Sequence, residues 1–599
     1  MELVKFIVVG LGLTAKYTLA ALLTDPRHLP QTQWDYIVVG AGTAGCVVAN
    51  RLSENPKVKI LVIEAGVQNT GPDASAIEVP FLVAEASSGT TFDWNYTTTP
   101  QAALNNRTTA YPRGFVLGGS SSTNYMAFTR GSSEEYNRLA SISGDSGWSW
   151  RKIFPYALKN EKHVASADNH KTTGEYNPSV HGNGPLLTSL PGTSTDIDNR
   201  VLETTKELHS EFPFNLDMNA GNPLGVGWLQ STIGNSVRSS SATAYLSPAL
   251  ANRSNINLLT NTRVTRLIKT NNLSSRFPTF LGVEFAQTAS GPRFTATARE
   301  EVILSAGSIG TPQILMLSGI GDQTKLSKLG IKTAVNLPDV GMNMQDHPFF
   351  ALQWSVNSTK TFDSIVNNAT AFSDAFAQYE ATGQGIFANN AIANHIGFFR
   401  LAESSGILKQ FGDPTAGPHS PHYEFAFING FYGTTQTEPT TGNYFSAAVI
   451  LVSPTSRGSV TLASDSPFDH PLIDPALLAT SFDQQVVVEA VEALQRFISA
   501  SPWKGYIKAP YGGSANATTR DGILEYARNS VISIRHPMGT AAMSQTRARA
   551  GVVDAHLLVK GVEGVRIVDA SVIPGIAAHP QAAVYIIAER AADLIKAAR

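Results

Sequence analysis

Cysteine is almost absent from this chain of 599 residues, and that scarcity excludes several kinds of chemistry. Cys46 is the only cysteine, so no intramolecular disulfide and no cysteine-based metal site can form. Charged residues make up only 15%, with a net charge of −2, which argues against a nucleic-acid or anionic-membrane partner. The sequence has no G-x-S-x-G, H-E-x-x-H or P-loop motif, so hydrolase, zinc-peptidase and P-loop NTPase functions have no support. We expect no metal site.

Long hydrophobic runs are also missing, because no stretch beyond the first thirty residues could span a membrane. Residues 1–30 resemble a secretory signal with an interrupted apolar core, and the alternative is an N-terminal helix kept in the mature protein. Glycosylation sequons favour the signal. We therefore expect a secreted, monomeric glycoprotein. The sequon asparagines are Asn95, Asn106, Asn252, Asn272, Asn357, Asn368 and Asn516.

A glycine-rich turn follows the first confident strand of the chain. The apolar run 36–39 is typical of a buried parallel strand, and Gly40, Gly42 and Gly45 follow it as G-x-G-x-x-G. These glycines permit a tight turn, close approach to a pyrophosphate, and close packing of the next helix. The next strand ends at Glu64, where a carboxylate would bind ribose hydroxyls. The pattern predicts a dinucleotide site for FAD or NAD, and the acid disfavours NADP.

Four later segments have clear local patterns. Residues 262–267 and 300–307 are predicted strands, and 581–598 is a predicted buried helix. Residues 311–318 are predicted to open a helix with Pro312 in its first turn. The region 350–450 is rich in Phe, Tyr and Asn, which predicts a substrate domain built on a sheet with an aromatic face.

Several motifs in a fixed order resemble those of the glucose–methanol–choline (GMC) family of FAD oxidoreductases. They are the G-x-G-x-x-G turn with Glu64, Gly118-Gly-Ser-Ser ending in Asn124, residues 307–321, Val340-Gly-x-Asn-x-x-Asp-His347, His536-Pro-Met-Gly-Thr, Val568-Asp-Ala-Ser571, and His579-Pro-Gln. The resemblance covers residues 34–597 and is closest to the fungal aryl-alcohol oxidases. Phe92-Asp-Trp-Asn-Tyr and the paired C-terminal histidines suggest that branch.

The resemblance implies an α/β (α+β) fold in which a Rossmann-like FAD-binding domain is intertwined with a substrate domain on an antiparallel sheet. It implies an N-terminal segment at 34–350 that mainly binds FAD, a substrate domain at 351–450, and a C-terminal segment at 451–599 with the catalytic histidines. Asn124 stands where some relatives have a histidine joined to the flavin, so we expect non-covalent FAD. The implied FAD contacts are Gly40, Gly42, Thr43, Ala44, Gly45, Glu64, Ala65, Gly118, Ser120, Ser121, Asn124, Tyr125, Met126, Ala127, Val264, Asp569, Ala570, Pro580 and Gln581.

Two histidines stand out by their surroundings, His536 in Ile534-Arg-His-Pro-Met-Gly-Thr and His579 in Ala577-Ala-His-Pro-Gln. The proline after each holds the residue extended and fixes the direction of its side chain. Alcohol oxidation needs a base for the hydroxyl proton and an acceptor for the hydride, and a neutral imidazole suits the first task. By the resemblance, His536 is the general base and His579 binds and orients the substrate oxygen.

Substrate-pocket residues are predicted on both sides of the catalytic motif. Tyr125, Phe431 and Tyr432 could line the entrance, and Arg535 stands where aryl-alcohol oxidases commonly have an aromatic residue. That arginine puts the aryl-alcohol preference in doubt and could bind an acidic substrate group. We expect oxidation of primary benzylic or allylic alcohols to aldehydes, with O2 reduced to H2O2. The alternatives are a quinone-dependent alcohol dehydrogenase and a non-redox lyase or cyclase with structural FAD.

Overall fold

The structure is a computed structural model that describes residues 21–86, 88–270 and 275–598. Most of the predicted leader, residues 1–20, lies outside the described residues. The remainder of the predicted leader belongs to the fold, since β1 (Ala21–Leu23) pairs in parallel with β9 (Ile256–Leu259) at a sheet edge. Among the described residues, no helix is both long enough and apolar enough to span a membrane.

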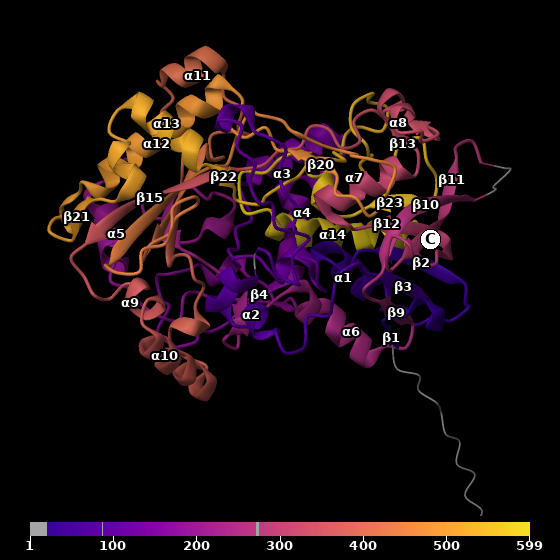
Figure 1. Cartoon of the computed structure of the whole chain (residues 1–599), viewed down its shortest axis with the longest axis horizontal. Helices are drawn as coiled ribbons and strands as arrows, with labels where there is room; N and C mark the ends of the chain where they lie inside the picture. Colours follow the sequence, from indigo (N-terminus) through magenta and orange to yellow (C-terminus); the bar gives the residue numbers. More distant parts are fainter. Residues whose placement is uncertain (1–20, 87, 271–274, 599) are drawn as a thin grey trace, which may run out of the picture.

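An eight-stranded sheet carries the dinucleotide motif and lies on the right in Figure 1. The order is β1-β9-β3-β2-β12-β11-β10, and β23 also pairs with β12. Neighbouring strands are parallel from β1 to β12 in this order, and β12 and β23 are also parallel. The β12–β11 and β11–β10 pairs are antiparallel. The further strands are β2 (Trp34–Val39), β3 (Ile60–Ile63), β10 (Arg263–Thr270), β11 (Thr279–Ala286), β12 (Phe294–Leu304) and β23 (Val565–Ile567). The central strands β2 and β3 are wholly buried, which explains their continuous apolar sequence.

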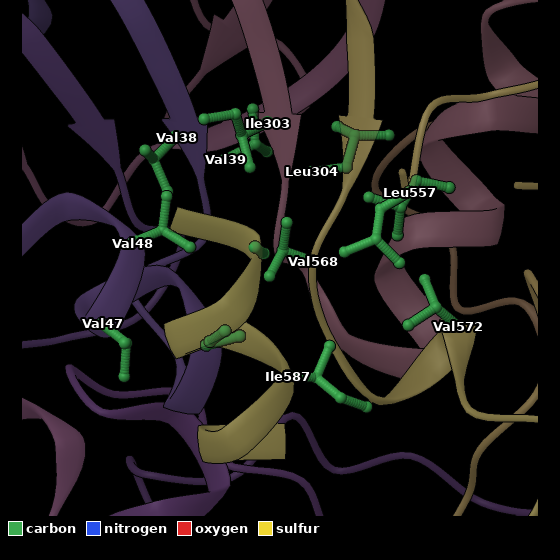
Figure 2. Packing of buried hydrophobic residues seen from close by; sticks show 14 of the residues in the cluster. Val38, Val39, Val47, Val48, Ile303, Leu304, Leu557, Val568, Val572 and Ile587 are labelled. Carbon is green, nitrogen blue, oxygen red and sulfur yellow. The ribbon is translucent and has the colours of Figure 1, made fainter. Parts of the chain in front are cut away.

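Two helices distant in sequence cover one face of this sheet. Helix α1 (Thr43–Leu52) follows the glycine turn, and α14 (Gln581–Ala597) brings the C-terminus back beside it. Figure 2 shows the resulting core, in which Val47 and Val48 of α1 and Ile587 of α14 lie beneath strand residues such as Val38 and Ile303. The predicted C-terminal docking helix thus closes the domain that the N-terminus begins.

The second sheet is antiparallel and lies on the left in Figure 1. Its order is β16-β17-β18-β15-β21, with β22 also paired to β15. It extends beyond the predicted range 351–450, because β21 and β22 come from the C-terminal segment. The strands are β15 (Pro348–Val356), β16 (His395–Phe399), β17 (Tyr423–Ile428), β18 (Tyr444–Leu451), β21 (Ile507–Pro510) and β22 (Ile532–Ser533).

The two faces of this sheet differ in character. One face packs against α12 (Ser481–Ile498) and α13 (Arg520–Ser530) and holds most of the aromatic rings, including Phe425, Phe427 and Phe445. The other face is mainly aliphatic and points toward the first sheet. Strand alternation therefore places the predicted aromatic face in the helix-covered core.

The predicted helix near residue 311 begins earlier than expected. Helix α7 runs over Gly307–Leu317, so Pro312 lies inside it rather than in its first turn. Proline has no N–H to donate to the carbonyl of Ser308, four residues back. The hydroxyl of Thr540 donates to that carbonyl at 2.7 Å instead. A tertiary contact, invisible in the local sequence, thus satisfies the carbonyl that proline leaves open.

Candidate active site

One long cavity runs between the two sheets and joins the glycine turn to the C-terminal histidines. At one end, it is lined by the backbone of the turn after β2, by residues 119–127 and by the start of α7. At the other end, it is lined by the aliphatic face of the second sheet and by residues 532–537. Catalytic and nucleotide-binding motifs that are hundreds of residues apart therefore border the same space.

The glycines of the turn are required by backbone contacts that leave no room for side chains. Gly40 has φ +96°, and a Cβ there would lie 2.5 Å from the carbonyl oxygen of Ser305. A Cβ on Gly45 would lie 1.9 Å from the oxygen of Gly40, and one on Gly119 would lie 2.8 Å from the Cα of Gly42. Gly42 also caps α1 without a side-chain hydrogen bond, which leaves N–H groups of the first turn available. This close-packed cradle at a helix N-terminus fits a pyrophosphate group.

Glu64 directly follows β3, lies at the nucleotide end of the cavity and is 6% exposed. Its carboxylate accepts hydrogen bonds from the backbone N–H groups of Ala41 and Gly66, both at 2.7 Å. Burial raises the pKa of this carboxyl, and the backbone donors oppose the rise. Val264 on β10 lines the same end.

Residues 118–127 form a rigid bend against the C-terminal segment. The amide nitrogen of Asn124 donates to Gln581 Oε1 at 2.9 Å, and Gln581 Nε2 donates to the carbonyl of Ala127 at 2.8 Å. The amide oxygen of Asn124 accepts from the N–H of Met126 and from the buried guanidinium of Arg238. Met126 has φ +64°, so this network holds a left-handed backbone at the cavity wall.

Asp346 organises the loop that carries His536. One carboxylate oxygen accepts the N–H groups of His347 at 2.8 Å and of His536 at 3.0 Å. The other accepts the hydroxyl of Ser533 at 2.5 Å and that of Tyr111. Burial raises the pKa of Asp346 while these donors counteract the rise. The Asp346 carboxylate therefore fixes the backbone positions of His347 and His536.

His536 contacts a second, fully buried histidine. Its Nδ1 lies 3.0 Å from Nδ1 of His347, so one of these nitrogens carries a hydrogen and the other accepts it. The Nε2 of His536 makes no hydrogen bond with the described residues, and the side chain lines the cavity. Burial, together with His579 and His347, holds the pKa of His536 well below its ordinary value of 6.5. Burial lowers the pKa of His347 to about 3. Both imidazoles are therefore neutral near neutral pH.

His579 lies beside His536, with ring centroids 5.0 Å apart. Its Nε2 lies 2.8 Å from Oε1 of Glu424, which is 1% exposed on β17. A carboxylate can only accept, so Nε2 carries the hydrogen and Nδ1 is the nitrogen left for another partner. The backbone N–H of His579 donates to the hydroxyl of Thr129 at 3.0 Å. The two histidines thus have unlike partners, one an imidazole and the other an acid.

The structure brings nearly all of the sequence-predicted residues to this one cavity. Tyr125, Tyr432 and Arg535 line it with both histidines, but Phe431 is not among the lining residues. The ring of Phe431 instead contacts Tyr444 and Tyr511. Gly45 and Gly118 are likewise not among the lining residues, and a Cβ on either would collide with neighbouring atoms. The predicted cofactor residues on the wall are Gly40, Gly42, Thr43, Ala44, Glu64, Ala65, Ser120, Ser121, Asn124, Tyr125, Met126, Ala127, Val264, Asp569, Ala570, Pro580 and Gln581.

Several residues of the site were not assigned a role from sequence. His347 and Asp346 belong to a recognised motif, but nothing local shows that they contact His536. Glu424 has a weak signal, since an acid inside the apolar strand Tyr423–Ile428 needs a buried partner. No group of three or more potential metal ligands occurs within the part of the chain that the structure describes.

Comparison with known proteins identifies the class of protein. Two family models match, GMC oxidoreductase N-terminal over residues 34–349 and GMC oxidoreductase C-terminal over 454–588. The chain therefore belongs to the GMC oxidoreductase family. It is 41% identical to dehydrogenase eriK of Hericium erinaceus, with 96% of both chains covered. It is 40% identical to pyranose dehydrogenase of Agaricus campestris, with 95% of both chains covered.

Solved structures agree with this assignment. Formate oxidase of Aspergillus oryzae, in a structure concerned with FAD modification, has a TM-score of 0.86 at 29% identity, with 95% of this chain and 99% of that chain covered. A fungal aryl-alcohol oxidase has a TM-score of 0.79 at 27% identity, with 94% and 99% covered. The predicted family and fold are confirmed, including the likeness to a fungal aryl-alcohol oxidase.

Proposed function

We propose that this protein is an FAD-dependent oxidoreductase that converts primary alcohols, benzylic or allylic, into aldehydes. The observation that carries the proposal is the single cavity with a dinucleotide cradle at one end and two histidines with unlike partners at the other. The aliphatic wall supports an apolar alcohol over a pyranose, because a sugar needs many hydrogen-bonding groups around it.

The cofactor assignment rests on the fit of this chain's residues. The turn at Gly40, Gly42 and Gly119 leaves space for a pyrophosphate, Glu64 suits the ribose hydroxyls, and Val264 lies at the adenine end. Bound FAD would supply the acceptor for the hydride that leaves the alcohol carbon. We propose that the cofactor is not covalently attached, because the amide of Asn124 is already held by Gln581, Met126 and Arg238. Acid precipitation should then leave the yellow colour in the supernatant, whereas a yellow pellet would contradict this.

His536 takes the hydroxyl proton in this proposal. We assign the hydrogen between the two imidazoles to Nδ1 of His536, which leaves its Nε2 with the free lone pair. The lowered pKa of His536 keeps that nitrogen unprotonated at working pH. Nδ1 of His579 donates to the substrate oxygen when both of its ring nitrogens carry hydrogens, and the Glu424 carboxylate on the opposite nitrogen balances that charge. His536 takes the hydroxyl proton, and bound FAD would accept the hydride, so that the product would be the aldehyde.

The electron acceptor has two candidates, O2, which would give H2O2, and a quinone. The relatives named as dehydrogenases in Hericium and Agaricus favour the second. A third function, a lyase or cyclase with structural FAD, would not require any alcohol to reduce the cofactor.

One spectroscopic experiment separates these functions. The purified protein is mixed under nitrogen with benzylic, allylic and aliphatic alcohols while the absorbance at visible wavelengths is followed. We expect a yellow protein that loses its colour with a benzylic or allylic alcohol. Rapid recolouring in air would indicate an oxidase, and recolouring only with benzoquinone a dehydrogenase. A yellow protein that no alcohol bleaches would overturn the proposal in favour of a lyase or cyclase.

We also propose that the protein is secreted as a glycosylated monomer, with the leader ending at or before residue 20 because β1 belongs to the sheet. Exposure of the described sequon asparagines supports glycosylation. N-terminal sequencing, glycosidase digestion and light scattering of the secreted product test these three points. The exposed asparagines are Asn95, Asn106, Asn252, Asn357, Asn368 and Asn516.

A further inference from the structure

Arg535 differs from every other charged side chain on the wall of the cavity. Within the described part of the chain, its guanidinium makes no hydrogen bond and no ion pair. The other charged groups are all engaged. Glu64, Asp569 and Glu424 accept hydrogen bonds from the protein, and Arg113 and Arg263 donate to backbone carbonyls. A half-buried guanidinium with open donors is a recognition group for an anion.

The backbone of Arg535 is fixed even though its side chain is not hydrogen-bonded. Its φ is +69°, a left-handed conformation that is unfavourable for a non-glycine residue. Two contacts hold it there. The N–H donates to the hydroxyl of Ser533 at 2.6 Å, and the carbonyl accepts from Nη1 of Arg113 at 2.7 Å. A residue pinned in a strained conformation immediately before His536 presents its side chain from a defined position.

Two tyrosines lie beside this guanidinium. The carbon at its centre lies 6.0 Å from the ring centroid of Tyr125. Tyr125 and Tyr432 both line the cavity, where the phenol of Tyr125 and the charge of Arg535 act on the phenol of Tyr432. Tyrosine hydroxyls can donate to the same anion that a guanidinium binds. The three side chains therefore form one polar corner in the wall.

The rest of the substrate wall is apolar. It comes from the cavity-facing side of the second sheet and from the strand before Arg535. Such a wall packs against hydrocarbon and offers few hydrogen bonds to a polar skeleton. The residues are Phe349, Ile396, Ala426, Ile428, Ala448, Ile450, Ile532 and Ile534.

We propose that the preferred substrate is an alcohol whose apolar skeleton carries a carboxylate, which Arg535 binds while the hydroxyl lies at His536 and His579. This inference rests on the proposed alcohol oxidation and adds the substrate class to it. Arg535 and His536 are consecutive in the chain, so a substrate that reaches both is compact, such as a single substituted benzene ring. The guanidinium donates to both carboxylate oxygens, as its planar fork allows.

The test compares substrates of matched size with the holoenzyme. The rate of cofactor reduction and kcat/KM are measured for 4-(hydroxymethyl)benzoate and for its uncharged methyl ester. We expect the carboxylate to be preferred by about 10- to 100-fold, the usual value of a charge-assisted hydrogen bond. Arg535→Met should abolish the preference, and Arg535→Lys should keep part of it. Arg520→Met, on an exposed residue of α13, is the matched control and should keep all of it.

A binding measurement gives a readout that does not depend on turnover. Benzoate and benzamide are titrated into the oxidised holoenzyme while the flavin spectrum is followed. We expect benzoate to bind at least tenfold more tightly than benzamide, and the difference to vanish in Arg535→Met. Salt should weaken benzoate binding to the wild type more than benzamide binding.

The outcomes separate this inference from the function on which it rests. Equal kcat/KM for the acid and its ester, with equal binding of benzoate and benzamide, would overturn carboxylate binding by Arg535 (the anion anchor) and leave the proposed alcohol oxidation intact. Benzoate binding that depends on Arg535, without reduction of the cofactor by any alcohol, would overturn the proposed function while supporting the anchor. If Arg535→Met does not fold, loss of the preference in Arg535→Lys at high salt decides the question, and a preference that salt leaves unchanged would count against the anchor.

Discussion

Two buried sites in this protein shift the pKa of their histidines in opposite directions. His536 faces a neutral imidazole, that of His347, and burial drives the pKa of both downward. His181 lies between two acids, with Nδ1 3.1 Å from Glu161 and Nε2 2.9 Å from Asp217. Although burial opposes it, those hydrogen bonds raise the pKa of His181. The same residue type thus has its pKa lowered in one place and raised in another, and its hydrogen-bonding partners decide which.

Removal of the proposed base should have the largest effect. In His536→Ala, the rate of cofactor reduction by alcohol should fall by about 10²- to 10⁴-fold, the typical contribution of a general base. Stopped-flow absorbance under nitrogen measures this rate directly. His419→Gln is the control, because that half-exposed imidazole pairs only with Glu134 at the surface. An unchanged rate in His536→Ala, with the cofactor still bound, would remove His536 from the mechanism.

Substitution of His181 should lower the free energy of unfolding and leave the reaction rate unchanged. His181→Gln removes the cation from Asp217, while Glu161 keeps its buried ion pair with Arg130, so the free energy of unfolding should fall by about 3 kcal/mol. His170 offers a matched control, because it also lies between two acids, Asp168 and Glu175, but its side chain is 32% exposed. His170→Gln should cost no more than about 1 kcal/mol. Urea unfolding of both variants measures the difference. Equal losses in the free energy of unfolding would show that burial does not determine how much the histidine contributes to stability.

The pH dependence of that stability follows from the directions of the pKa shifts. Because the pKa of His181 is raised on folding, its contribution is fully present below about pH 6.5 and is lost as pH rises through the folded value. The pKa values of Glu161 and Asp217 are lowered, so their contributions are present above about pH 4 and are lost as pH falls. The stability gap between wild type and His181→Gln should therefore be largest between these limits.

Local sequence was sufficient for one part of the molecule. Gly40 and Gly45 could be predicted because Gly40 has a positive φ and a Cβ on Gly45 would collide with the carbonyl oxygen of Gly40 in the same strand–turn–helix unit. His536 and His579 can be predicted from the sequence because each precedes a proline in a recognisable motif. These features depend on neighbours in the chain, so a sequence pattern can carry them.

The rest depends on pairing between distant segments. His347 reaches His536 only because residues 345–349 pair with residues 532–538, nearly two hundred positions later. Glu424 meets His579 because of the register of β17 in the second sheet. Distant contacts also separate the neighbours Phe431 and Tyr432, since Tyr432 lines the cavity and Phe431 packs against Tyr444. No spacing in the sequence specifies such contacts.

The histidine pair itself can be tested with two substitutions. His347→Leu removes the acceptor for Nδ1–H of His536, so the tautomer with Nε2 unprotonated is no longer favoured. We expect kcat to fall by about tenfold or more, with KM nearly unchanged, since an orienting partner acts on the base and not on binding. His347→Gln keeps an acceptor and should retain part of the rate. Equal rates for Leu, Gln and wild type would show that the contact is only structural.

The smallest effect should appear in the acid limb of the pH profile. His536 is active when neutral, and its pKa lies well below 6.5 because of burial and two neighbouring imidazoles. kcat/KM should therefore hold its value as pH falls past 6.5 and decline only at lower pH. In His347→Leu, an apolar side chain replaces a neutral hydrogen-bond acceptor, so the imidazolium form of His536 is further disfavoured and the acid limb should move to lower pH. Steady-state kinetics from pH 4.5 to 8 with a benzylic alcohol measures both profiles. A wild-type limb at or above pH 6.5 would mean that the cavity does not keep His536 neutral, and the contrast with His181 would then fail.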